Sequence, residues 1–186
     1  KLAASPHNAA REEGIKIDFD KIYSDFLTII NEQDLTGSRQ LSSVNLIIEG
    51  AGGLMVPLNK NEFVIDLVKK LNTKVVLVSR NYLGSINHSL LTASVCKQHN
   101  IDVLGWIFND QYMNYEDEIV QWSGYPKIVS IPFTKKIDST FIHEQAAVIK
   151  SNLKSLIISF EKPIRPFLSA ALILILEISG ISLPLL

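Results

Sequence analysis

Hydrophobic positions along this chain alternate between helical spacing and short continuous runs. Apolar residues recur every three or four positions after Asp18, which predicts a helix that Asp18 could cap. Four short apolar runs predict buried strands, and these cover residues 44–48, 74–79, 101–108 and 127–131. Further helical patterns cover residues 63–71, 87–99, 114–123 and 139–153. Residues 1–16, with a turn at Ser5-Pro6-His7, and residues 32–43 are predicted to be irregular.

Strands that alternate with helices favour right-handed crossover units and an α/β fold with a three-layer parallel sheet. In such a sheet, ligands bind where the strands end. Three predicted strands end in unusual polar residues, namely Glu49, the segment 81–87 and the pair Asn109-Asp110. We therefore expect these residues to meet at one edge of the sheet.

The last part of the chain differs from the rest, so we divide the chain into an α/β domain over 1–156 and an apolar tail over 157–186. Residues 167–186 are apolar except for Glu177, three serines and Gly180. A segment of about 20 such residues could span a bilayer. However, Glu177 near its middle would cost about 2.5–3.5 kcal/mol, and Gly180 and Pro184 weaken a helix. A frame-altered or foreign tail, or a segment that packs on the domain, is the favoured interpretation.

Composition excludes several classes of protein. The chain has 186 residues, 47% of them apolar, which suits one packed domain. A net charge of −1 without a basic stripe argues against nucleic acid as a partner. Cys96 is the only cysteine, so no disulfide can form within the chain, and we interpret it as a buried bystander. With no signal-peptide pattern at the start, a reducing cytoplasm is expected.

The first candidate site is the run Glu49-Gly50-Ala51-Gly52-Gly53. A carboxylate at the end of a buried strand can hold Mg²⁺, directly or through water. The glycines after it allow positive φ angles and let backbone N–H groups approach a phosphate. An ordinary tight turn after a strand would look the same, so both interpretations stay open.

Two further segments carry candidate chemistry. Ser85 or Asn87 could cap a helix whose N-terminus can bind an anion, although plain capping needs no ligand. His88 is interpreted as structural, because no second His or Cys stands at ligand spacing. The side-chain amide of Asn109 offers a donor and an acceptor that match adenine, while a turn-forming pair with Asp110 is the alternative.

Taken together, these motifs resemble the dethiobiotin synthetases. The resemblance rests on residues 49–58, 83–92 and 105–110, with Ser5-Pro6-His7 and Glu12-Glu13-Gly14 before them. Their order and spacing agree over residues 5 to about 153. The EGAGG run alone is weakly specific, since cobyrinate-type amidases have related loops, whereas its combination with LGxINHxLLT and GWxxND is highly specific.

The resemblance implies a P-loop NTPase-like homodimer that uses ATP, Mg²⁺ and CO₂. Such enzymes close the ureido ring of 7,8-diaminononanoate through a carbamate and a carbamic-phosphoric anhydride. The implied metal ligand is Glu49, and Gly84, Ser85 and Asn87 would meet the substrate carboxylate across the dimer interface. The implied ATP contacts are Glu49, Gly50, Ala51, Gly52, Asn109, Asp110, Ile131, Pro132 and Phe133.

One family feature is missing from these residues. No glycine in the chain is followed by lysine, so the phosphate-binding motif G-x-x-x-x-G-K-[ST] is absent. In the family this loop, its catalytic lysine and a further Mg²⁺-binding Asp would precede Lys1. We therefore expect a sheet without its first strand, no catalytic residue in this chain, and no activity of the chain alone. The alternatives are a non-catalytic nucleotide-binding or dimerising relic and a membrane-tethered binding module.

Overall fold

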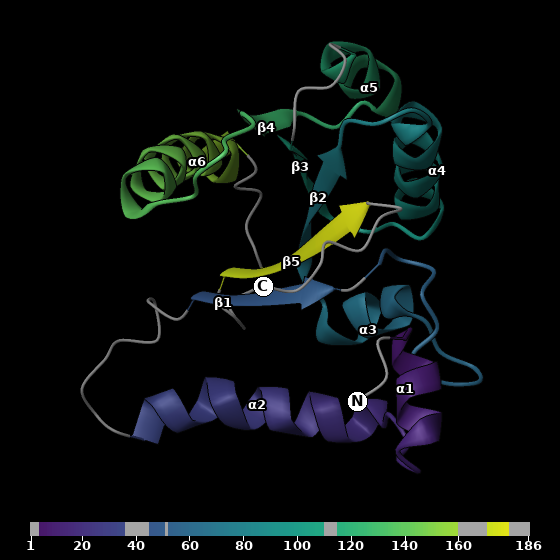
Figure 1. Cartoon of the computed structure of the whole chain (residues 1–186). Helices are drawn as coiled ribbons and strands as arrows, with labels where there is room; N and C mark the ends of the chain where they lie inside the picture. Colours follow the sequence, from purple (N-terminus) through teal and green to yellow (C-terminus); the bar gives the residue numbers. More distant parts are fainter. Residues whose placement is uncertain (1–3, 36–44, 51, 110–114, 160–170, 179–186) are drawn as a thin grey trace.

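A computed structural model describes residues 4–35, 45–50, 52–109, 115–159 and 171–178, and its centre is a parallel sheet (Figure 1). Five strands form the sheet in the order β1-β5-β2-β3-β4. The strands are β1 (Asn45–Gly50), β2 (Lys74–Arg80), β3 (Val103–Asn109), β4 (Lys127–Ile131) and β5 (Ala171–Ile178). Every neighbouring pair is parallel, as the alternation of strands and helices predicted.

Helices cover both faces of this sheet and make the predicted three layers. They are α1 (Pro6–Glu12), α2 (Phe19–Leu35), α3 (Val64–Leu71), α4 (Ser85–Gln98), α5 (Glu116–Ser123) and α6 (Ser139–Ser159). One core contains Val75 and Leu77 of β2 together with buried residues of α3, α4 and α5. The opposite core contains Val76 and Val78, packed with residues of α6. Because side chains alternate between the two faces of β2, this strand contributes residues to both cores.

The strand β5 comes from the tail and lies inside the sheet. It pairs in parallel with β1 on one side, where Asn45 meets Ala171, and with β2 on the other, where Lys74 meets Ile173. Of the favoured interpretations of the tail, that of a segment that packs on the domain is consistent with this strand, which belongs to the sheet itself. Among the helices of the described ranges, none is both long and apolar enough to cross a membrane. The proposed domain boundary at residue 156 falls inside α6, which runs beyond the predicted end at residue 153.

Two predictions at the N-terminal end were wrong. Residues 6–12 form α1 in place of a turn, because Pro6 occupies the first helical position, where its missing N–H costs nothing. The second helix extends to Leu35, so it covers the start of the loop predicted over residues 32–43.

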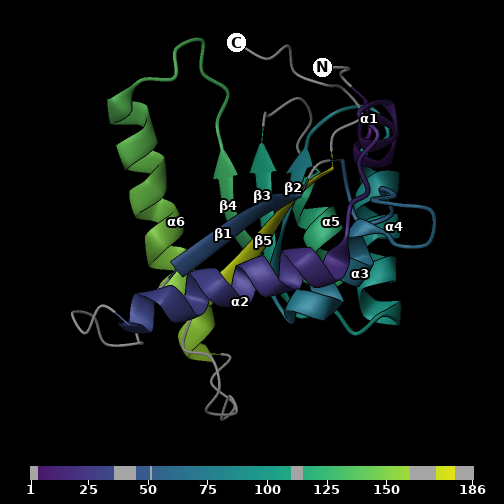
Figure 2. The same ribbon diagram turned by 90° about the horizontal axis from the view of Figure 1, so that it is seen from below.

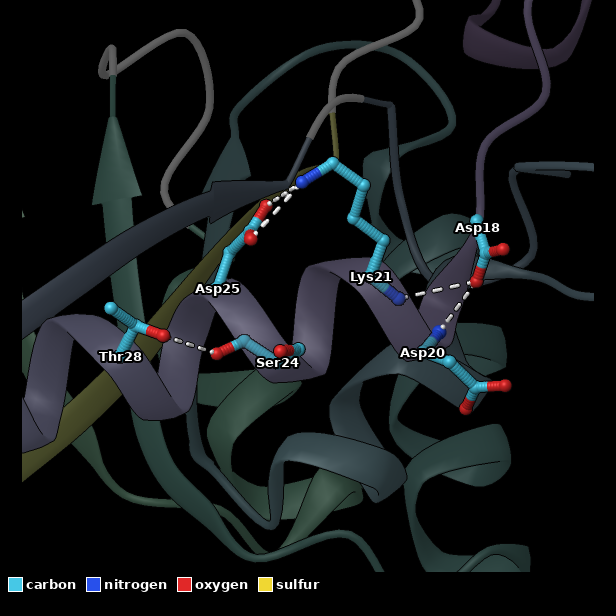
Figure 3. A network of polar contacts seen from close by, with 6 residues as sticks. All are labelled: Asp18, Asp20, Lys21, Ser24, Asp25 and Thr28. Carbon is cyan, nitrogen blue, oxygen red and sulfur yellow. Dashed lines mark hydrogen bonds and ion pairs between the residues drawn. The ribbon is translucent and has the colours of Figure 1, made fainter.

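The predicted cap of α2 is confirmed. One carboxylate oxygen of Asp18 accepts hydrogen bonds from the backbone N–H groups of Asp20, at 2.8 Å, and Lys21, at 3.2 Å (Figure 3). These two bonds, the Lys21 bond first, lower the pKa of Asp18. The side chain of Lys21 meanwhile pairs with Asp25 one turn further along the helix. The entry into α2 is therefore fixed by local hydrogen bonds.

Candidate functional site

The carboxyl ends of the strands meet on one side of the sheet, which we call the carboxyl edge. Figure 2 shows the arrowheads of β2, β3 and β4 pointing to that side. It is formed by Glu49 and Gly50 at the end of β1, the segment 81–87 after β2, Asn109 at the end of β3 and Ile131–Phe133 at the end of β4. The expectation that Glu49, the segment 81–87 and Asn109 share an edge is confirmed, whereas Ala51 and Asp110 lie outside the described residues.

On β1, Glu49 lies on the face turned away from α2 and α3. Leu46 and Ile48 pack against Phe26 and Leu71 on the helical side. The period of the strand therefore places Ile47 and Glu49 on the opposite face, where both are exposed. Glu49 belongs to the strand itself and does not follow it, and its carboxylate is open to a ligand.

The loop after β1 is anchored to the start of α3. Its Leu54 carbonyl accepts from the N–H of Ile65 at 2.9 Å, and its Val56 carbonyl accepts from the N–H of Val64 at 3.0 Å. In this loop Gly52 and Gly53 have positive φ angles of 79° and 114°, as the glycine run allowed. The second half of the loop is thus fixed to α3.

Glu49 is compatible with a magnesium ion that is shared with phosphates. Mg²⁺ in nucleotide sites takes one or two carboxylates, several waters and phosphate oxygens. Within the described ranges, no group of three or more His, Cys, Asp or Glu side chains could hold a metal ion on its own. One exposed carboxylate therefore suits a metal that arrives with a nucleotide, and it does not make a closed protein site.

The helix α4 begins two residues earlier than predicted, and neither Ser85 nor Asn87 caps it. Gly84 occupies the capping position with a φ of 101° and offers no side chain. Ser85 is the first helical residue and is fully buried, and its N–H already donates to the Tyr82 carbonyl at 3.0 Å. Asn87 is exposed. In the described part of the chain, the N–H groups of Ile86 and Asn87 are therefore the ones in the first turn of α4 without a backbone acceptor.

His88 lies one turn into α4 and contacts Tyr82. Its Nδ1 shares a short hydrogen bond with the Tyr82 hydroxyl, and the two rings are 5.8 Å apart. Burial, with a smaller contribution from Tyr115, raises the pKa of Tyr82. This contact supports the structural interpretation of His88.

The ends of β3 and β4 complete the carboxyl edge. Asn109 is half-buried, and its carbonyl accepts from the backbone N–H of Asn81 at 3.0 Å. After Ile131 the chain leaves the sheet, and both Pro132 and Phe133 are exposed, Phe133 at 68%. An aromatic ring this exposed beside a strand end is available to stack on a planar ligand.

A buried polar cluster behind the edge was not predicted. Glu116, at the start of α5, is 6% exposed and accepts from Asn81 Nδ2 at 3.1 Å and from the hydroxyl of Ser130. Lys127 Nζ lies 3.7 Å from the same carboxylate and 2.7 Å from Asp117. The hydrogen bond that Lys127 donates to Asp117, helped by the negative charges of Asp117 and Glu116, raises the pKa of Lys127. The sequence shows only an acidic first turn, which gives no sign that one of its members is buried.

Next to that cluster, the hydroxyl of Tyr115 bridges the loop before α4. It accepts from Ser85 Oγ at 3.0 Å and donates to the Tyr82 carbonyl at 2.6 Å. This contact was also missed, because Tyr115 lies 30 residues from Ser85 in the sequence.

Comparison with known proteins places this chain in a family. A family model described as an AAA domain matches residues 1–140. The ATP-dependent dethiobiotin synthetase of Cytophaga hutchinsonii is 40% identical over 154 residues, which cover 82% of this chain and 68% of that protein. The protein of the same name from Christiangramia forsetii is 37% identical over 80% of this chain and 65% of its own length. That of Legionella pneumophila (strain Corby) is 42% identical over 63% of this chain and 52% of its own length. The chain thus spans about two thirds of the first two relatives and about half of the third.

Proposed function

Since the chain belongs to the family of ATP-dependent dethiobiotin synthetases, we propose that its carboxyl edge serves the ligation that gives this family its name. The reaction is the ATP-driven closure of the ureido ring of 7,8-diaminononanoate with CO₂. Because the chain spans only part of the length of its relatives, the proposal concerns a protein that also contains a phosphate-binding loop. The 186 residues considered alone contain no such motif.

The observation that carries the proposal is the meeting of three different chemistries at one edge. An exposed carboxylate on β1, a helix start with unpaired N–H groups after β2, and an amide at the end of β3 lie at the ends of parallel strands. A ligase that transfers the γ-phosphoryl group of ATP to an anionic substrate, with ADP as the leaving group, needs a metal ligand, an anion site and a base contact close together. Each of the three matches one of these needs.

Each segment would act through its own atoms. The carboxylate of Glu49 would hold Mg²⁺ beside the phosphates, with the backbone of Gly50, Ala51 and Gly52 facing them. When bound, the ion supplies positive charge that offsets the charge of the transferring phosphoryl group.

At the other segments, the amide of Asn109, with Asp110, would contact the adenine base from the end of β3. The segment Ile131-Pro132-Phe133 would contact the same base from the end of β4, with the exposed ring of Phe133 stacked on it.

The helix start after β2 would bind the carboxylate of the diamino acid. Its donors would be the N–H groups of Ile86 and Asn87, at the positive end of α4, where an anion gains about 0.3–1 kcal/mol. Gly84 has no side chain that could separate the backbone from the ligand. The space around it is open, because a Cβ built on Gly84 would meet only Tyr82, at 4.0 Å. Ser85 would contribute through the backbone, because its hydroxyl is already bonded to Tyr115.

A second subunit would cover this helix start. Leu83 is 87% exposed and Leu91 is 57% exposed, and both flank the exposed Asn87. Large apolar side chains left in water around a proposed ligand site favour a partner surface. The resemblance supplies the identity of that partner, namely a second copy of the chain in a cytoplasmic homodimer.

Product formation tests the proposal. The 186-residue chain, incubated with ATP, Mg²⁺, bicarbonate and 7,8-diaminononanoate, is expected to make no dethiobiotin, because the N–H groups and lysine of a phosphate loop are missing. A chimera that adds the N-terminal strand and loop of the Cytophaga hutchinsonii relative should make it. Two chimeras, with and without residues 160–186, separate the effect of the added strand from that of β5, which already lies between β1 and β2. If both chimeras fold and bind ATP but form no product, the proposal is wrong.

A further inference from the structure

We propose that Tyr115 and Glu116 are positioning residues that fix the start of α4 and the end of β4 relative to each other. The two side chains are neighbours at the N-terminal end of α5, and each reaches a different ligand-facing segment. The identity of the ligands rests on the proposed function, whereas the contacts that define the joint do not. We call these two residues the α5 joint.

The first arm of the joint is the Tyr115 hydroxyl. It receives a hydrogen bond from Ser85 Oγ at 3.0 Å and gives one to the Tyr82 carbonyl at 2.6 Å. These partners stand on either side of Gly84, so one hydroxyl closes the loop that precedes α4. Ser85 is fully buried, and no other side-chain hydrogen bond of its hydroxyl is found in the described part of the chain. The arm therefore sets where the first N–H groups of α4 point.

The second arm is the Glu116 carboxylate. One of its oxygens accepts from Asn81 Nδ2 at 3.1 Å, and the other accepts from the Ser130 hydroxyl, one residue before the end of β4. A carboxylate that is 6% exposed is costly to bury unless its oxygens are bonded and its charge is paired. Lys127 Nζ at 3.7 Å supplies that charge. The arm thus ties the end of β2 to the end of β4 across β3.

In the second arm, Asn81 is the hydrogen-bond donor and Glu116 is the acceptor. The backbone N–H of Asn81 holds the Asn109 carbonyl, and its side chain is 3% exposed, with Oδ1 buried and without a donor in the part of the chain that the structure describes. The amide must present Nδ2 to the carboxylate, because the opposite orientation would place oxygen against oxygen. Donor and acceptor can therefore be exchanged deliberately between Asn81 and Glu116.

Because the two arms start from consecutive residues of one helix turn, loosening either should release both segments. Hydrogen exchange of the 186-residue chain measures this without any ligand. Tyr115→Phe and Glu116→Ala should each speed exchange of the amides in 82–88 and in 129–133 by about tenfold, the size expected when a buried hydrogen bond is lost. The matched controls are Tyr23→Phe on α2 and Glu118→Gln, an exposed acid two residues further along α5.

The pattern of the change decides the outcome. Faster exchange in both segments, with β2 and β3 unchanged, supports the joint. Faster exchange in only the segment that each arm touches, the same increase throughout the chain, or no change would overturn it.

An exchange of donor and acceptor gives a sharper test that does not depend on removing a side chain. Asn81→Asp sets two buried carboxylates against each other and should loosen both segments. Adding Glu116→Gln provides an amide that donates to the new carboxylate and still accepts from Ser130, so the double variant should recover most of the protection. A double variant no better than Asn81→Asp alone would contradict the joint.

The ligand roles are tested separately in an active chimera. There, Tyr115→Phe should raise the KM for the diamino acid, and Asn81→Asp should raise the KM for ATP, each more than it lowers kcat. If the exchange pattern appears but neither KM changes, the α5 joint stands and the assignment of ligands to the carboxyl edge fails.

Discussion

At the scale of single residues, burial separates the side chains that shape the carboxyl edge from those that can meet a ligand. Ser85 and Glu116 are buried and bonded to other parts of the protein. Glu49, Asn87 and Phe133 are exposed at the same edge. A substitution of a buried member should therefore change the geometry of the edge, whereas a substitution of an exposed member should change binding and leave folding nearly intact.

The first prediction concerns Glu49. In an active chimera, Glu49→Gln should raise the Mg²⁺ concentration needed for half-maximal turnover by at least about tenfold, because a neutral oxygen replaces a charged ligand. Binding of ATP without metal should change little. Glu144→Gln on α6, also exposed, serves as the control. Identical Mg²⁺ titrations of the variant and the parent would rule out this role.

The second prediction concerns Cys96 and pH. Burial raises the pKa of Cys96 from 9.0 to about 12, and burial, with a smaller effect of Cys96, raises the pKa of Tyr125 from 10.0 to about 12. Both groups bind protons more tightly in the folded state, so their contribution to stability is complete below pH 9 and is lost as the pH rises through 12. The urea concentration at the midpoint of unfolding should therefore fall as the pH rises from 9 to 12.

Cys96→Ala should flatten that fall, although it lowers stability at pH 7 by about 1 kcal/mol through lost packing. In the parent, the thiol should resist alkylation at pH 8 until the chain is unfolded, since it is 0% exposed. Rapid alkylation of the native chain would contradict the buried-bystander interpretation.

Sequence reasoning found Glu49 and Asn109 at the edge and missed the buried Glu116 for a physical reason. Glu49 stands next to a glycine run and Asn109 ends a hydrophobic run, so local pattern marks both. Glu116, in contrast, is followed by Asp117 and Glu118, and only the fold decides which of the three turns inward. Hydrogen bonds between residues far apart in the sequence cannot be predicted from the pattern of neighbouring residues.

At the scale of elements, four of the five strands were predicted, whereas β5 and the starts of α1 and α4 were not. A buried strand is a continuous apolar run, and such runs stand out in the sequence. A helix start depends on one backbone conformation. The left-handed φ of Gly84 begins α4 two residues before the hydrophobic pattern does, and Pro6 begins α1 where a proline also suits a turn.

Two glycines give a prediction at this scale. Gly105 lies in β3 where β4 approaches closely, and a Cβ there would lie 2.4 Å from the Pro126 carbonyl oxygen. That oxygen accepts from the N–H of Trp106 at 2.8 Å, so it cannot move without breaking the sheet. Gly105→Ala should therefore cost at least about 3 kcal/mol of unfolding free energy.

Gly84→Ala provides the contrast. Its Cβ would meet nothing closer than 4.0 Å, and only the φ of 101° is unfavourable, so the cost should be about 1 kcal/mol. Chemical denaturation of both variants measures the difference. If both substitutions lower the unfolding free energy by the same amount, the effect of Gly105→Ala comes from its backbone conformation and not from the close approach of β4.

At the scale of the whole molecule, the order of the strands in the sheet could not be predicted from the sequence pattern. The tail was recognised as apolar and as a segment that could pack on the domain, but nothing local indicates that it lies between β1 and β2. Strand order depends on contacts between residues more than a hundred positions apart, such as Asn45 with Ala171. Hydrophobic pattern predicts that a strand is buried and does not predict which neighbours bury it.

This arrangement gives β5 a role in the geometry of the carboxyl edge. In the described residues, β1 forms ladder hydrogen bonds with β5 and with no other strand. Gly50 pairs with Leu176, and two residues later Ile178 pairs with Ser79. The distance between Glu49 and the start of α4 is therefore set through β5.

The last prediction is that β5 holds β1 in the sheet. Ile175→Pro removes a backbone donor in the middle of a strand that is paired on both sides, which a central strand does not tolerate. Amides of residues 45–50 should then exchange at least about tenfold faster, while the pairing of β3 with β4 keeps its protection because it does not involve β5. Ile175→Val, which keeps the N–H and the β-branched side chain, is the matched control. A chain ending at residue 159 should behave like the proline variant. If β1 stays protected in that shortened chain, β1 is held by its packing against α2 and α3, and the role assigned to β5 is wrong.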